Sequence, residues 1–172
     1  MTPAKPDDSD ALYSAVGFVV VQWGIAEQLL DGVVAMLYHS FGGRTLAKRL
    51  PKQLEVKLKF VRKCVTTNPD LAPFAVKIAS VADTFERLSS LRHDLIHGAI
   101  ASLTAEGGMV FKFQKLDFMD PHMHRLRVVR FDAADFPKLT EDLVDLGSLT
   151  GEVAKELIAD HERRLPGAAI GA

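Results

Sequence analysis

The chain of 172 residues contains a single cysteine, Cys64, and is almost electrically neutral, with 21 Lys and Arg against 22 Asp and Glu. One cysteine cannot form an internal disulfide or a zinc site built from several thiolates, and it suits a reducing compartment. A net charge of −1 gives no overall basic field, so any contact with a polyanion has to come from a local patch. Cys64 lies among Phe60, Val61 and Val65, and we expect a buried thiol.

The sequence also lacks glycine-rich loops that cradle phosphates, a dinucleotide-binding fingerprint and a Ser-His-Asp arrangement. We therefore expect no cofactor. The most apolar stretch, residues 11–26, follows an acidic segment where a secretory signal would need basic residues. Gln22 and Glu27 interrupt this stretch before it reaches the roughly 20 apolar residues of a membrane-spanning helix. The pattern predicts a buried helix, no membrane partner and a cytoplasmic protein.

Hydrophobic periodicity predicts four helices in one domain that spans residues 11–165. Residues 1–10 are expected to be a disordered lead with a helix cap at Ser9 or Asp10, and residues 166–172 a frayed tail. We expect helices at about residues 11–39, 44–66 and 72–103, and a last helix that Asp132 caps. Pro51 should kink or split the second helix.

Each predicted helix carries one apolar stripe that should face the core. In the first helix the stripe consists of Val20, Trp23, Glu27, Leu30, Val34 and Leu37. In the second helix, with the lysines outward, it consists of Leu46, Leu50, Leu54, Leu58 and Val61. In the last helix it consists of Phe136, Leu139, Leu143, Leu146, Thr150, Val153 and Leu157.

The residue pattern changes at Gly107, and the new pattern lasts to about residue 131. Residues 109–113 and 126–130 are rich in β-branched and aromatic side chains and predict the two strands of a hairpin with a long loop between them. The predicted fold is therefore mainly all-α. It is an antiparallel four-helix bundle with a small β-hairpin inserted between the third and fourth helices.

One charged residue of the third helix interrupts its apolar face. On a helical wheel Arg92 falls inside the arc of core residues, whereas His93, Asp94 and His97 project from the other side. A guanidinium in that arc needs an anion or another hydrogen-bonding partner. Glu27 interrupts the stripe of the first helix in the same way, so we predict an ion pair between Glu27 and Arg92. Such a pair fits a purely structural role, fixing the helix register, as well as it fits a functional one.

The segment Arg92-His93-Asp94-Leu95-Ile96-His97 resembles the signature of the HEPN superfamily, which is an arginine followed after four to six residues by a histidine. The residue after the arginine is usually polar in that signature, and here it is His93. The order of the helices, and a long first helix with a Trp and a Glu, also resemble HEPN proteins of bacterial toxin and defence systems. The likeness covers residues 11–103 and the final helix.

This resemblance implies metal-independent cleavage of RNA by a homodimer, with 2′,3′-cyclic phosphate ends. It implies Arg92, His97 and His93 as the catalytic residues, with Glu27 and Asp94 in supporting positions. It also implies RNA as the substrate and an antitoxin or another protein as a further partner. Many HEPN members lack activity, so a non-catalytic helical module for dimerisation or nucleotide binding is the alternative.

Two further patterns compete with this interpretation. His93 and His97 also form an H-D-x-x-H sequence, and histidines at positions i and i+4 can share a metal on one helix face, as in a metal-dependent hydrolase. No third ligand follows at a characteristic spacing, and we predict no metal site there or at His122 and His124. The second helix carries a basic face that is typical of either a solvated surface or contact with phosphates. It consists of Arg44, Lys48, Lys52, Lys57, Lys59, Arg62 and Lys63.

Overall fold

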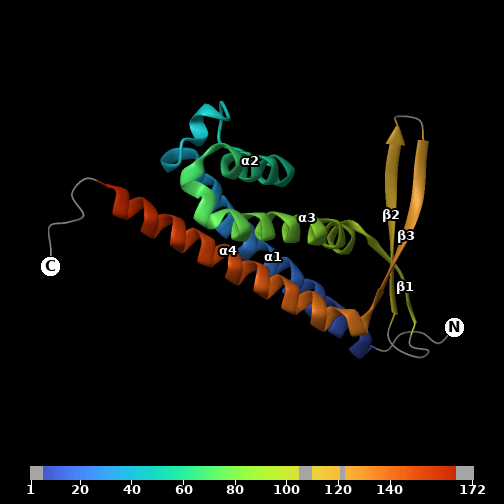
Figure 1. Cartoon of the computed structure of the whole chain (residues 1–172). Helices are drawn as coiled ribbons and strands as arrows, with labels where there is room; N and C mark the ends of the chain where they lie inside the picture. Colours follow the sequence, from blue (N-terminus) through green and yellow to red (C-terminus); the bar gives the residue numbers. More distant parts are fainter. Residues whose placement is uncertain (1–5, 105–109, 121–122, 166–172) are drawn as a thin grey trace. The chain divides into compact units, whose positions relative to one another are not determined.

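The computed structural model describes residues 6–104, 110–120 and 123–165 (Figure 1). Over these ranges the chain is mostly helical, with four α-helices and a three-stranded antiparallel sheet, which confirms the mainly-α class. The helices are α1 (Pro6–Ser40), α2 (Leu54–Thr67), α3 (Ala75–His97) and α4 (Phe136–Arg164). The strands are β1 (Ala99–Thr104), β2 (Val110–Asp120) and β3 (Met123–Asp132). Short 3₁₀ helices cover Gly43–Thr45, Pro69–Phe74 and Ala133–Asp135.

The chain divides into two compact units, although one domain was expected over residues 11–165. The first unit contains residues 1–23 and 88–143, and the second contains residues 24–87 and 144–172. The helices α1, α3 and α4 each contribute residues to both units. The sheet and residues 88–97 of α3 belong to the first unit, which therefore contains every predicted site residue except Glu27.

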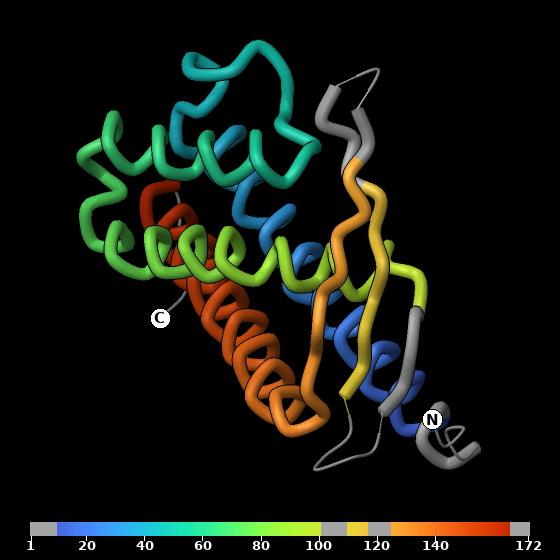
Figure 2. Tube along the Cα trace, turned by 90° about the vertical axis from the view of Figure 1, so that its right-hand side faces the viewer, coloured from blue at the N-terminus to red at the C-terminus, as the bar shows by residue number. Residues whose placement is uncertain are grey.

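The sheet of the first unit has the strand order β1-β2-β3, and one of its faces is aromatic. Phe111 and Phe131 lie opposite each other in the register of β2 and β3, and Phe113 follows on the same face. The rings of Phe113 and Phe131 meet edge to face with centroids 5.5 Å apart, and the Phe111 ring meets that of Phe136 at 5.8 Å. These four buried rings form the core beneath the sheet. In Figure 2, β2 and β3 run across the C-terminal end of α3.

The two predicted strands lie within β2 and β3, which pair antiparallel, but they belong to a three-stranded sheet and are longer than the sequence indicated. The strand β2 extends to Asp120 and β3 begins at Met123, so most of the residues expected in a long loop belong to the strands. The third predicted helix is wrong at its C-terminal end, because α3 stops at His97 and residues 99–104 form β1. Gly98 ends the helix, and Ile100 and Thr104 are β-branched residues that favour strands.

In the second unit, the predicted helix at residues 44–66 is wrong in its first part. After the 3₁₀ turn Gly43–Thr45 the backbone is irregular, and α2 begins at Leu54, just beyond Pro51. Leu50, expected to face the core, is exposed. Cys64 is buried as predicted, and burial raises the pKa of its thiol to about 11.

The lysines of α2 are not all outward. Lys57 is only 4% exposed, and its Nζ lies 2.5 Å from an oxygen of Asp31 and 3.4 Å from an oxygen of Glu27. These contacts of Lys57 with Asp31 and Glu27 join α2 to α1. On the predicted basic face, Arg62 binds two acidic side chains, Asp83 and Glu86, at 2.7 Å. Lys57 and Arg62 are therefore neutralised within the protein rather than available for phosphates.

The helices at the two ends of the chain follow the sequence patterns closely. All seven residues of the predicted α4 stripe are buried. A carboxylate oxygen of Asp132 accepts a hydrogen bond from the amide of Ala134 at 3.2 Å, so Asp132 caps the short 3₁₀ helix that precedes α4 rather than α4 itself. The first helix begins at Pro6 rather than after Asp10, so the predicted disordered lead is too long. In its stripe Val20 is exposed, contrary to expectation, and Val19 is buried instead.

By length and composition, α1 is apolar enough to cross a membrane. Its most apolar window lies within Asp10–Ser40 and has a mean hydropathy of 1.3, and 33% of that window is buried inside the protein. Core helices of soluble proteins meet the same criterion.

Candidate active site at the end of helix α3

Arg92 is partly buried, as its place in the apolar arc of α3 predicts. Its guanidinium carbon lies 5.8 Å from the ring centroid of Trp23, a cation–π contact within the first unit. The Nε of Arg92 is buried and has no hydrogen-bond partner among the residues that the structure describes. A buried donor of this kind is costly unless a ligand or another group accepts its hydrogen bond.

Glu27 has a partner in its own unit. Its carboxylate is 3.4 Å from the buried ammonium of Lys57, which the sequence pattern placed in solvent. Arg92 belongs to the other unit, so the Glu27–Arg92 ion pair stays a prediction. The resemblance implies a supporting role for Glu27 in catalysis. Its contact with Lys57 offers a structural role instead, because this contact helps to hold α2 against α1.

His93 and His97 lie together on the exposed side of α3, as predicted. Their ring centroids are 4.6 Å apart, with an angle of 54° between the ring planes. Partial burial lowers the pKa of His93, and the positive charges of Lys115 and of a protonated His97 lower it further. His93 is therefore held in its neutral form near pH 7, where it can accept a hydrogen bond or a proton.

Asp94 does not project with the two histidines, which corrects the prediction. It is 7% exposed, and its two oxygens accept hydrogen bonds from the two terminal nitrogens of Arg127, at 3.0 and 2.5 Å. The Nζ of Lys115 lies 3.5 Å from one of the same oxygens. Lys115 on β2 and Arg127 on β3 are directly opposite in the strand register, so both point to one carboxylate. We call these three residues the Asp94 clamp.

The sequence pattern missed the clamp because a helical wheel considers α3 alone. The inserted sheet covers the side of α3 that carries Asp94, and that sheet comes from residues later in the chain. A signal was nevertheless present. Lys115 follows Phe111 and Phe113 at alternate positions of β2, and Arg127 lies on the face that also holds Phe131. Arg127 lies in a predicted strand, and a cation on the core face of a strand needs an anion, just as Arg92 does, whereas Lys115 lies beyond the strand predicted at residues 109–113.

Gly98 lets α3 and β2 approach each other beside the clamp. A Cβ at this position would lie 2.6 Å from the carbonyl oxygen of Asp94 and 2.8 Å from the Cβ of Phe113. The amide of Gly98 donates to that same carbonyl at 3.0 Å and so completes the last turn of the helix. A larger residue would push the sheet away from His97 and the clamp.

The end of α3 has Lys115 and Arg127 on one carboxylate beside two imidazoles, and the charge of Arg92 also acts on His93. Such a set can bind a phosphate and transfer protons. The H-D-x-x-H alternative gains no support, because the Asp94 carboxylate is bound by the clamp. Within the described part of the chain, no group of three or more His, Cys, Asp and Glu side chains is placed to hold a metal ion. His122 lies outside the described residues.

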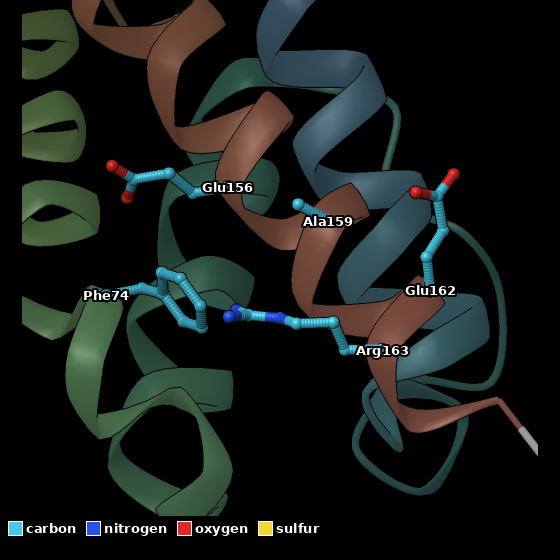
Figure 3. Close-up of a pocket in the computed structure, with 5 residues that line it drawn as sticks. All are labelled: Phe74, Glu156, Ala159, Glu162 and Arg163. Atoms are coloured by element: carbon cyan, nitrogen blue, oxygen red, sulfur yellow. The ribbon is translucent and has the colours of Figure 1, made fainter. Parts of the chain in front are cut away.

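Two hollows in the second unit contain none of the predicted catalytic residues. One, of about 540 Å³, is lined by Phe74, Glu156, Ala159, Glu162 and Arg163 (Figure 3). In this view the Arg163 side chain reaches toward the Phe74 ring, and Glu162 points away from it. Glu156 binds Lys77 at 2.5 Å. The other hollow, of about 340 Å³, includes His161 and Arg164, whose guanidinium binds Asp70. The charges of Glu156 and Arg164 form ion pairs within the protein, and we assign no chemistry to either hollow.

No protein-family model matches the sequence, and the comparisons with curated proteins and with solved structures give no match. The geometry at the end of α3 is therefore the basis for a functional proposal. Four of the five predicted site residues lie in this region, and Lys115, Arg127 and Trp23 join them there.

The contact of Gly98 with Phe113 predicts a steric penalty for a methyl group. Gly98→Ala should lower the free energy of unfolding by about 1–3 kcal/mol, because the new Cβ would have to displace β2 or the end of α3. Gly147→Ala is the matched control, since its Cβ would meet no atom within 4 Å and alanine is the better helix former. It should raise the free energy of unfolding by about 0.5–1 kcal/mol. Urea denaturation measures both, and equal effects of the two changes would contradict the account.

The electrostatics of His93 predict a second effect. Lys115→Gln should raise the pKa of His93 toward its ordinary value of 6.5, because it removes a positive charge that disfavours protonation. Lys112→Gln, at an exposed position on the other face of β2, should leave that pKa unchanged. An NMR titration of the imidazole carbons measures the difference.

The sign of the pH effect on stability follows from the same shift. Because folded His93 binds a proton less readily than the unfolded chain does, stability should fall as the pH drops through 6.5. This loss should be smaller in Lys115→Gln. A His93 pKa that stays constant or falls in this variant would refute the assignment.

Proposed function

We propose that the protein is a HEPN-type, metal-independent endoribonuclease that acts as a homodimer, with Arg92 and His97 as its main catalytic residues. The observation that carries the proposal is the state of Arg92. It is partly buried over Trp23, with a buried Nε that has no hydrogen-bond partner among the described residues, one turn from an exposed pair of histidines. In this proposal the four helices form an antiparallel HEPN bundle, and the sheet is an insertion between the third and fourth.

The reaction we propose is an internal transesterification of RNA. His97 accepts the proton of a ribose 2′-hydroxyl, and the 2′-oxygen attacks the adjacent phosphorus. The bond from phosphorus to the 5′-oxygen breaks, and that oxygen takes a proton from a protonated imidazole. The products are a 2′,3′-cyclic phosphate and a 5′-hydroxyl. Arg92 stabilises the charge on the phosphoryl oxygens, and neutral His93 accepts a hydrogen bond that orients its neighbour.

The charges around the histidines support a phosphate-containing substrate. The chain has almost no net charge, so an RNA-binding patch must be local. Arg92, Lys115 and Arg127 provide three positive charges against the single negative charge of Asp94. The charges of Lys115 and Arg92 both act on His93, whose ring lies against that of His97, where the scissile phosphate would have to bind. Arg127 keeps part of its side chain exposed while it binds Asp94, so its guanidinium can also face a ligand.

The divergence of the two catalytic residues supports a homodimer. Arg92 and His97 are five residues apart, which is about 140° around the helix. The guanidinium lies over Trp23, whereas the His97 imidazole is on the exposed side. A second copy, related by a two-fold axis, would supply the missing member of each pair. In the toxin or defence setting that the resemblance implies, an antitoxin or another protein would be a further partner.

One observation favours a second candidate, a non-catalytic dimerisation or nucleotide-binding module. Asp94 binds Lys115 and Arg127 of the sheet, and an ion network of this kind also occurs where only structure is needed. A folded protein that binds nucleotide or dimerises without cutting RNA would fit this candidate.

The test is cleavage of a structured RNA by chelator-treated protein. His97→Ala should lower the rate by about 100-fold or more, because it removes the proton acceptor. Arg92→Lys should also lower the rate strongly, since a lysine keeps the charge but not the planar fork of donors. His39→Ala is the control, because His39 is a histidine of the second unit that binds Arg44. Its rate should equal that of the wild type.

Thermal unfolding of each variant separates loss of chemistry from loss of fold. The ends of the product should be 2′,3′-cyclic phosphates. Wild-type protein that is folded but cuts no RNA would contradict the proposed enzyme activity, and the non-catalytic module would then be the remaining candidate. Cleavage that stops with chelator and returns with zinc would favour the H-D-x-x-H alternative instead.

A further inference from the structure

The exposed side of α1 has the composition of a protein interior. Residues 11–26 include no charged side chain over more than four helical turns. One side of this stretch, with Leu12, Val19 and Trp23, is buried in the first unit. A helix that is apolar all round is normally covered on all sides. In the part of the chain that the structure describes, however, the opposite side is open.

Several large apolar side chains occupy that open side. Tyr13 is 63% exposed, Val20 44% and Val21 58%, and Phe18 is exposed as well. Gly17 lies between them, at helical spacings of four residues from both Tyr13 and Val21. A Cβ at Gly17 would meet no atom within 4 Å, so the glycine leaves a notch flanked by bulky residues. We call Tyr13, Gly17, Val20 and Val21 the α1 seam.

We propose that the α1 seam is the contact through which two copies of this chain dimerise, with a two-fold axis near Gly17. In an antiparallel pair, Gly17 of each copy faces Gly17 of the other, and Tyr13 of each lies opposite Val21 of the other. The glycines permit the closest approach of the helix axes, and the larger side chains pack on either side. The inference rests on the proposed function only in its need for two copies, and it names the surface that joins them.

The absence of charge on the α1 seam supports a second copy of this chain as its partner. A face on a two-fold axis meets itself, so any unpaired charge on it would face its own kind. The seam carries none. Asp7, Asp8 and Asp10 precede it in the sequence, and an antiparallel arrangement keeps these acids of the two copies apart. The paired histidines of α3 are polar and offer little apolar area, so the main contact lies on α1 rather than on them.

The same acids argue against a lipid surface. Helices that lie on membranes carry Lys and Arg beside their apolar face, because the lipid surface is negative. Here the residues that flank the apolar stretch are Asp10 on one side and Glu27 on the other. No Lys or Arg occurs between Lys5 and Arg44, so this helix offers anionic lipids no positive charge.

The position of the seam connects it to the candidate active site. Val20 is one helical turn before Trp23, whose ring holds the Arg92 guanidinium. A partner that covers Val20 would therefore lie within about one turn of the Arg92 site. The seam covers only about 12 Å of helix from Tyr13 to Val21. Since stable dimers bury about 800 Å² per partner, we expect association at micromolar rather than nanomolar concentrations.

Sedimentation of the full chain between about 5 and 200 µM, a range set by the expected affinity, tests the inference. The wild type should shift from monomer toward dimer, and Val21→Glu should stay monomeric at every concentration, because it places two carboxylates at the seam. The matched control is Val76→Glu, since Val76 is an even more exposed valine on α3. It should sediment as the wild type does. Thermal unfolding checks that both variants fold, which their exposure favours.

A cross-linking experiment tests whether the two-fold axis of the dimer lies near Gly17. Gly17→Cys should form a disulfide-linked dimer under mild oxidation, because residues at the axis bring their Cα atoms within the roughly 4.4–6.8 Å that a disulfide needs. The native Cys64 is buried and does not compete. Gly32→Cys, at another glycine of α1 with open space around its Cβ position, should not cross-link to itself.

A wild type that is monomeric throughout, a dimeric Val21→Glu or equal cross-linking at the two cysteine positions would overturn the inference. So would binding of the monomer to phosphatidylglycerol vesicles through the seam. A dimer that cuts no RNA would refute the proposed function alone, whereas an RNA-cutting dimer that survives Val21→Glu would refute this inference alone.

Discussion

The ionic contact of Asp94 with Arg127 and Lys115 fixes the geometry at the end of α3. It joins a helix in the middle of the chain to two strands that follow it, and it does so between the two histidines of the motif. Asp94 is buried there, so its charge requires these partners. Without them the last turn of α3 would lose its support from the sheet, and His97 and Arg92 would lose their fixed directions.

The neighbouring residues depend on this contact. Gly98 makes room for Phe113, and Phe113 anchors the sheet through its edge-to-face contact with Phe131. Lys115 serves two roles, because it binds Asp94 and its charge also lowers the pKa of His93. A single insertion between two helices thus supplies both the mechanical support of the motif and most of the positive charge around it. The proposal of RNA cleavage depends on that combination.

The elements that the sequence predicts well are those whose pattern is local. The stripe of α4, the cap at Asp132 and the burial of Cys64 follow from spacing within one helix or turn. The periodicity of α3 likewise predicts the partial burial of Arg92. The features it misses have distant partners. The sheet covers Asp94, and the buried Lys57 binds acidic side chains of α1. Residues 99–104 become a strand because β2 is available to pair with them. No wheel drawn for one helix contains that information.

The central claim, that the Asp94 clamp holds the end of α3, is tested most directly by a double-mutant cycle. Unfolding free energies of the wild type, Asp94→Asn, Arg127→Gln and the double variant give the coupling between the two side chains. The account predicts a favourable coupling of about 1–2 kcal/mol, as expected for a hydrogen-bonded pair of charges of which one is partly exposed. Effects that add to within about 0.5 kcal/mol would show that the two residues act independently, and would contradict it.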